Sequence, residues 1–219
     1  MKISNELISS SPIFINPSFE QVLDLRGCHI LNLDNLSATL DYFNCIDLSN
    51  NLIEEVAPDV ELKNLRTLIL SNNKIFKVVA IDQLFPSLEN LVLSNNNIKD
   101  IESIIVLRKC KNLKRLFLIN NPVSFISDYR LKICSMLPNL KVLDFTKFSK
   151  NEKNEARNKY PNQSSLEITK ILKSMSKKEK LKKLIESVKT LEEANRLELL
   201  ISSEQLSDDL IDQLLVKVI

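Results

Sequence analysis

One short pattern recurs along the chain and limits the folds open to it. Each full copy spans eight residues. Positions one, three and eight are apolar, and positions five and six are asparagines. The clearest copies read IDLSNNLI, LILSNNKI and LVLSNNNI. With the weaker copies included, the first apolar position falls at residues 23, 46, 68, 91, 116 and 143, which gives steps of 22 to 27 residues. A period of this length predicts a solenoid in which each unit packs on its neighbours.

The spacing within the pattern is that of a leucine-rich repeat, an α/β fold. In each unit the flanking apolar residues form a short strand whose leucines point inward, and successive strands stack as a parallel sheet. We call the sheet face that points away from these leucines the concave face. Short helices or irregular segments return the chain along the convex side. The sequence therefore predicts a leucine-rich-repeat solenoid over residues 1–149.

The second asparagine of each pair is predicted to lie inside the solenoid. A side-chain amide both donates and accepts hydrogen bonds, so it can pair backbone groups that the turn after each strand leaves without partners. We expect a buried ladder with a structural role, made by Asn51, Asn73, Asn96 and Asn121. The first asparagine of each pair is expected to form the turn at the outer edge.

The residues beside the inward leucines point to the concave face, which no part of the repeat covers. Ile69, Val92 and Phe117 hold the central position of successive strands, about 4.8 Å apart. Apolar residues there suit a strand by β-propensity alone, but an exposed apolar stripe favours a partner-binding site, and an amphipathic helix would fit it. The predicted partner-binding residues are Asp24, Arg26, Asp47, Ile69, Val92, Arg115, Phe117 and Ile119.

Each end of a solenoid needs a cap. Apolar residues between Ile3 and Phe19 are expected to cover the first strand. A helix over about 127–136, with Tyr129 and Arg130, is expected to close the other end. The predicted repeat domain thus has a cap on both sides.

Beyond the repeats the chain becomes polar and then helical. Residues 150–164 are predicted to be a linker, and residues 165–219 have apolar positions at helical spacing behind two capping boxes, which predicts an all-α extension. The lysine cluster from Lys173 to Lys183 suits a nuclear-import signal, a phosphate contact or a solvated helix face equally well. A second basic run offers RNA phosphate contacts at Arg108, Lys109 and Lys111.

Composition argues against catalysis. The chain has one glycine and one histidine, Gly27 and His29, so it has no glycine-rich phosphate loop and no evident catalytic base. The four cysteines lie 17, 65 and 24 residues apart, without metal-ligand or redox spacing. No apolar stretch reaches the roughly 18 residues of a membrane span. We predict no enzyme activity, cofactor, metal site or small-molecule substrate, and no membrane partner.

Several stretches resemble one family. The segments LDLRGCHI, ATLDYFNCIDLSNNLI and NNPVSFISDYRLKICSMLPNLKVLDF, and the later KKLIESVKTLEEANRLELLI, are similar to the A-prime proteins of the U2 small nuclear ribonucleoprotein. The resemblance covers most of residues 1–150. The Leu-Asp-Leu-Arg-Gly start, the Ala-Thr-Leu-Asp-x-Phe stretch and the Tyr-Arg cap are more specific than the repeat itself.

The resemblance implies a nuclear scaffold of pre-mRNA splicing. In that family the concave face binds a helix of an RRM protein, B-double-prime, and the pair binds a stem-loop of U2 small nuclear RNA. The family's Asp-Leu-Arg element corresponds to Asp24 and Arg26. Other spliceosome proteins are expected at the C-terminal helices. The alternative is a leucine-rich-repeat regulatory or adaptor subunit of a phosphatase or cytoskeletal complex, which co-purification would distinguish.

Overall fold

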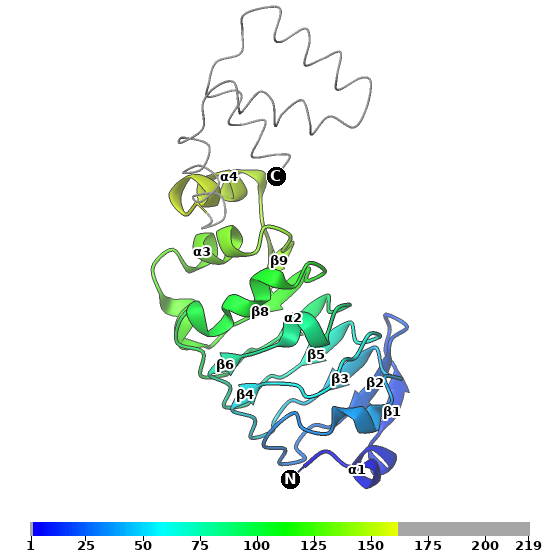
Figure 1. Cartoon of the computed structure of the whole chain (residues 1–219). Helices are drawn as coiled ribbons and strands as arrows, with labels where there is room; N and C mark the ends of the chain where they lie inside the picture. Colours follow the sequence, from blue (N-terminus) through cyan, green and yellow to red (C-terminus); the bar gives the residue numbers. More distant parts are fainter. Residues whose placement is uncertain (1, 162–219) are drawn as a thin grey trace, which may run out of the picture. The chain divides into compact units, whose positions relative to one another are not determined.

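The computed structural model describes residues 2–161, and its main element is an eight-stranded sheet (Figure 1). The strands from β2 to β9 in this sheet run parallel, whereas β1 and β10 pair antiparallel at its two ends. This architecture confirms the leucine-rich-repeat solenoid. In spatial order the strands are β1 Ile13–Ile15, β2 Gln21–Asp24, β3 Cys45–Asp47, β5 Thr67–Ile69, β7 Asn90–Val92, β8 Arg115–Phe117, β9 Val142–Leu143 and β10 Thr146–Lys147.

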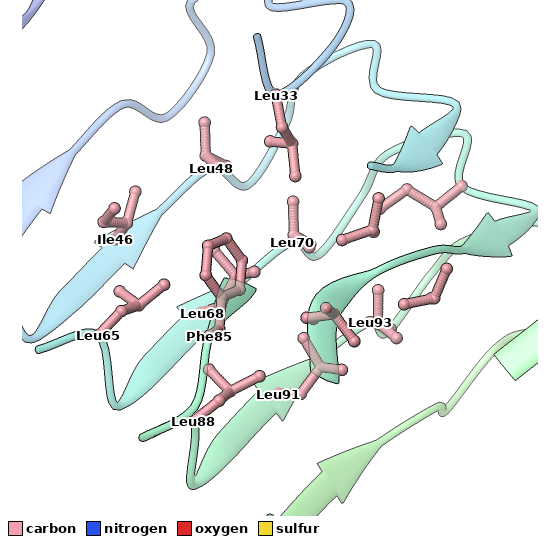
Figure 2. Close-up of a cluster of buried hydrophobic side chains, with 14 of the residues drawn as sticks. Leu33, Ile46, Leu48, Leu65, Leu68, Leu70, Phe85, Leu88, Leu91 and Leu93 are labelled. Atoms are coloured by element: carbon pink, nitrogen blue, oxygen red, sulfur yellow. The ribbon is translucent and has the colours of Figure 1, made fainter. Parts of the chain in front are cut away.

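The inward apolar positions of successive units form one continuous core. The register sets them side by side across the sheet, and their side chains are buried: Leu23, Ile46, Leu68, Leu91, Leu116 and Leu143. Figure 2 shows part of this core, where Phe85 of a return segment lies among the leucines of neighbouring units. Burying one such side chain contributes about 1.5–3 kcal/mol, so the stacked core is the main source of stability.

The second asparagines form the predicted ladder. Oδ1 of Asn96 accepts a hydrogen bond from the backbone N–H of Ile75 at 2.9 Å. Its Nδ2 donates to the carbonyl oxygens of Leu70 and Leu93, each at 2.9 Å. The same set of contacts, shifted by a unit, is made by Asn51, Asn73 and Asn121. Each amide thus joins the backbone of its own unit to that of the preceding unit, although Asn73 is only half-buried.

The first asparagines form the turns at the outer edge, as predicted. They adopt the left-handed conformation with φ of 56–57°, which asparagine tolerates better than most residues. Their exposed amides also bond to one another, since Asn120 donates to Asn95, and Asn95 to Asn72, at 2.7 Å in both cases. In the first unit Gly27 takes this place at φ 70°.

Short segments return the chain along the convex side. They contain a two-stranded parallel sheet of β4 (Glu55–Val56) and β6 (Lys77–Val78). Their helices are η1 (Leu36–Thr39), α2 (Ile81–Leu84) and the 3₁₀ helix η2 (Glu102–Lys109). The predicted alternation of strands with short helices or irregular segments is therefore present in the described residues.

Both ends of the sheet are capped. At the N-terminal end, α1 (Asn5–Ser10) buries Leu7 and Ile8, and its first turn is capped by the side chain of Ser4. At the other end, η3 (Pro122–Phe125) leads into α3 (Tyr129–Met136). Tyr129 packs against the core, so the cap contains the helix and tyrosine expected there.

The predicted linker of residues 150–164 is helical over α4 (Lys150–Lys159). Ser149 and Glu152 form a capping box that starts this helix. Ala156 is buried, and the hydroxyl of Tyr160 donates to Asp128 at 2.6 Å, so the compact unit extends to Tyr160 rather than ending at residue 149. The segment is strongly charged and buries only Ala156 within the helix, so its sequence did not indicate a packed helix. The predicted helical extension of 165–219 and the lysine cluster lie outside the described residues.

Acid should weaken the C-terminal cap through Glu152. Hydrogen bonds from the Arg130 guanidinium, at 2.6 Å, and from the backbone of Ser149 lower the pKa of Glu152 from 4.5 to about 2. A carboxyl group whose pKa is lower in the folded than in the unfolded chain contributes stability above the unfolded pKa, and that stability is lost as pH falls through the folded pKa. Wild-type protein should therefore melt higher than Glu152→Gln at pH 7, and the gap should close between pH 4.5 and 2. Circular-dichroism melts across this range would measure the gap, and a constant gap would contradict the assignment.

Candidate partner-binding face

Strand pairing brings the predicted central residues into one line on the concave face. Asp24, Asp47, Ile69, Val92 and Phe117 each lie directly beside the next, because they share a register position in β2, β3, β5, β7 and β8. Figure 1 shows these strands side by side in this order. We call these five residues the central row. Its first two members are acidic and its last three are apolar.

The apolar members of the central row are half-buried rather than fully open. Side chains on neighbouring strands stand only about 4.8 Å apart, so each one shields the next. Ile119 follows β8 and is also half-buried, and its carbonyl oxygen accepts from the Asn95 backbone at 2.8 Å. Packing within the row thus reduces the exposure expected from the sequence but leaves one side of each residue accessible.

The concave face is partly covered along the edge where β2, β3 and β5 begin, which corrects the expectation of an open face. Val22, Cys45 and Thr67 are buried. The Thr67 hydroxyl donates to the carboxylate of Glu20 at 3.1 Å, and the register puts Phe14 of β1 beside Val22. The hairpin that caps the solenoid therefore also covers this edge.

The acidic end of the central row holds Arg26 in place. Arg26 donates to Asp24 through Nε at 2.8 Å and through Nη2 at 2.5 Å, and its Nε lies 3.8 Å from Asp47. The hydrogen bond from Arg26 lowers the pKa of Asp24, so this carboxyl group stays ionised at neutral pH. Two carboxylates against one guanidinium leave a net negative charge that suits a cationic group on a partner.

The end of the central row at Phe117 contains a further aromatic residue, Phe145. Leu143-Asp144-Phe145 reads as a final copy of the motif, which predicts an inward Phe145. Phe145 is instead 76% exposed, and its ring centroid lies 4.7 Å from that of Phe117. Asp144 and Phe145 adopt left-handed φ angles of 50° and 66°, which reverse the chain and turn the side chain outward.

Asp144 explains why the last copy departs from the pattern. In earlier units the leucine after the strand donates to a carbonyl oxygen of the following strand, as Leu93 does to Phe117 at 2.8 Å. Within residues 2–161 no further repeat follows β9, and the backbone N–H of Leu118 donates to Oδ1 of Asp144 at 2.7 Å. The Tyr129 hydroxyl donates to Oδ2 of the same carboxylate at 2.9 Å. The aspartate itself gave no signal in the sequence, because Asp24 and Asp47 hold the same place in units that continue the sheet.

The predicted basic residues lie apart from the central row. Arg115 is the first residue of β8, two positions before Phe117, and its side chain donates to the Asn90 side chain at 3.0 Å. Arg108 and Lys109 end η2 on the convex side, and the exposed Lys111 lies in the turn before β8. Arg115 therefore lies on the concave face, whereas Arg108, Lys109 and Lys111 do not.

The described part of the chain offers little for catalysis. Residues 2–161 contain no group of three or more potential metal ligands. Within the same range no helix is long and apolar enough to cross a bilayer. Burial raises the pKa of both Cys45 and Cys110 to about 12, which keeps these thiols protonated and unreactive.

Comparison with known proteins decides the family. A family model described as leucine-rich repeat matches residues 1–173. The probable U2 small nuclear ribonucleoprotein A' of Drosophila melanogaster is 31% identical over 83% of this chain and 68% of its own length. The human and Arabidopsis thaliana U2 small nuclear ribonucleoprotein A' proteins are 31% and 36% identical, over 81% and 78% of this chain and 70% and 69% of theirs. The chain belongs to the U2 small nuclear ribonucleoprotein A' family.

A solved relative extends the match to three dimensions. The crystal structure of the Drosophila melanogaster SNF/U2A' complex superimposes with a TM-score of 0.72 at 33% identity, covering 78% of this chain and 98% of that one. Membership of the family makes the chain a leucine-rich-repeat component of a splicing ribonucleoprotein and not an enzyme. It also favours this family over the phosphatase or cytoskeletal adaptor that the repeat alone left open.

Proposed function

We propose that the chain is the scaffold subunit that binds an RRM protein of the B-double-prime type on its concave face, within the nuclear U2 particle. The pair then binds a stem-loop of U2 small nuclear RNA in pre-mRNA splicing. The observation that carries this proposal is the continuous central row, acidic at one end and apolar at the other. It is supported by a relative solved in a complex named SNF/U2A'.

The dimensions of the row suit a helix. From Asp24 to Phe117 the row crosses five neighbouring strands, which is roughly 19 Å at 4.8 Å per strand. An α-helix of about 13 residues has this length. A helix with apolar residues on one face would cover Ile69, Val92 and Phe117, and a cationic residue at its other end would pair with the carboxylates. Helices bind grooves in this way in many complexes.

The proposed division of labour leaves base recognition to the partner. Phosphate contacts hold a protein on RNA, whereas sequence is read at the bases by stacking and edge contacts. We assign backbone contacts to Arg108, Lys109 and Lys111, near the end of η2. Other spliceosome proteins are assigned to the predicted C-terminal helices, beyond the described residues.

Isolated chain should bind the U2 stem-loop weakly and without sequence preference. No aromatic residue is interleaved with the basic run from Arg108 to Arg115, so the affinity of that run for RNA is mainly electrostatic. Addition of the RRM subunit should raise both affinity and specificity. Fluorescence-anisotropy titrations at physiological salt, with a scrambled stem-loop as the control RNA, would measure this.

The same titrations test the phosphate contacts. For the ternary complex, Lys109→Ala or Lys111→Ala should reduce the slope of log affinity against log salt by about one. Lys63→Ala is a matched control, because Lys63 is exposed on an earlier return segment. Tight, sequence-specific binding by the isolated chain would contradict the proposed division between the two proteins.

A further inference from the structure

A further exposed aromatic residue extends the apolar end of the central row beyond Phe117 of β8. Phe145 lies beyond β9 in the sequence, yet its ring packs against Phe117 with the centroids 4.7 Å apart and the planes inclined at 51°. Phe145 is 76% exposed, so most of the ring is free to contact another molecule. The apolar surface therefore runs from Ile69 through Val92 and Phe117 to Phe145.

The backbone at Phe145 does not favour a phenylalanine. Its φ of 66° follows a φ of 50° at Asp144, and a Cβ atom makes this left-handed region unfavourable for bulky residues. Most other left-handed positions of this chain hold small or polar residues, such as Gly27, Asn72 and Asn95, and the bulky apolar exceptions are Phe19 and Leu40. A turn alone would be better served by glycine or asparagine at residue 145.

Residues of the C-terminal cap hold the turn at Asp144 and Phe145 through hydrogen bonds. The carboxylate of Asp144 accepts from the Leu118 backbone and from the Tyr129 hydroxyl. The Arg130 guanidinium donates to the carbonyl oxygens of Leu143 at 3.2 Å and Lys147 at 2.9 Å. Hydrogen bonds on both sides of Phe145 thus hold the backbone of its turn in place without a partner, which lowers the entropic cost of binding.

We propose that Phe145 is a partner-binding residue and that, with Phe117, it forms an aromatic wall for one end of the partner's helix. This inference rests on the proposed function of the concave face. The group received there is an aliphatic or methionine side chain, because both rings present apolar surface. Asp24 and Asp47 at the opposite end take a cationic residue, so the two ends of the row set the direction of the bound helix.

The test is calorimetric titration of the full chain with the recombinant RRM subunit of the same particle. Losing a buried phenylalanine contact should weaken binding by about ten- to a hundredfold in Phe145→Ala and Phe145→Gly. Phe145→Leu should restore affinity to within about fivefold of wild type, since it keeps most of the apolar surface. Phe19→Gly is the matched control, because Phe19 is also exposed and left-handed, at φ 60°, but lies in the turn between β1 and β2.

Thermal melts separate a binding role from a structural one. Glycine accepts φ 66° without a Cβ clash, so Phe145→Gly should melt higher than Phe145→Ala, the reverse of the usual order. If Phe145→Gly melts well below wild type, the ring serves the fold and the inference is wrong. Wild-type affinity in both variants, with binding lost in Val92→Asp/Phe117→Asp, would overturn the inference but keep the proposed function. Wild-type affinity in all of them would overturn both.

Discussion

The double substitution Val92→Asp with Phe117→Asp should abolish partner binding while the solenoid stays folded. Both side chains lie on the concave face, and the core leucines that flank them, Leu91 and Leu116, are untouched. In the complex each acid would replace an apolar contact worth about 1.5–3 kcal/mol and would be buried without a partner for its charge. We expect a loss of several kcal/mol in binding, measured by calorimetry.

Folding should change much less than binding. The two new carboxylates would be cross-strand neighbours and would repel each other, so we expect the melting temperature to fall by only a few degrees. Ile105→Asp is the control, because Ile105 is 51% exposed on η2 at the convex side and should leave the affinity unchanged. Unfolding of the double variant would place those residues in the core, and normal binding would exclude the concave face as the partner site.

The substitution Asn96→Ala should destabilise the chain by about 1–3 kcal/mol. It removes the acceptor for the Ile75 N–H and the donor to the carbonyl oxygens of Leu70 and Leu93, all inside the solenoid. A buried polar group left without a hydrogen bond costs about 1–3 kcal/mol. Urea denaturation should show a lower midpoint with an unchanged slope, because the surface exposed on unfolding is the same.

The neighbouring asparagine gives the matched control for the ladder. Asn95 is exposed, and its φ of 56° suits glycine, so Asn95→Gly removes an amide without straining the turn. Its cost should stay below about 1 kcal/mol, since water can replace the lost hydrogen bonds. Equal losses in the two variants would mean that burial does not distinguish the two asparagine positions.

The repeat made most of the fold and much of the face predictable. Once Leu68 and Leu70 point inward, Ile69 must point to the opposite face, and the fixed register then aligns it with Val92 and Phe117. The ladder followed from the same reasoning, because every turn after a strand leaves the same backbone groups to be paired. The bond between Arg26 and Asp24 was not predicted, since it depends on how two side chains of neighbouring positions fold back on each other.

Sequence alone therefore determined the period, the inward leucines, the asparagine ladder, the order of the central row and the family. Tertiary structure alone decided the ends of the solenoid: the outward turn of Phe145, the cover that Glu20 provides over Thr67, and the docking of α4. The physical reason is that an internal unit packs against near copies of itself, so its local pattern specifies its surroundings. A terminal unit lacks one neighbour, and its backbone groups are paired by side chains from distant segments, as Leu118 is by Asp144 and Leu143 is by Arg130.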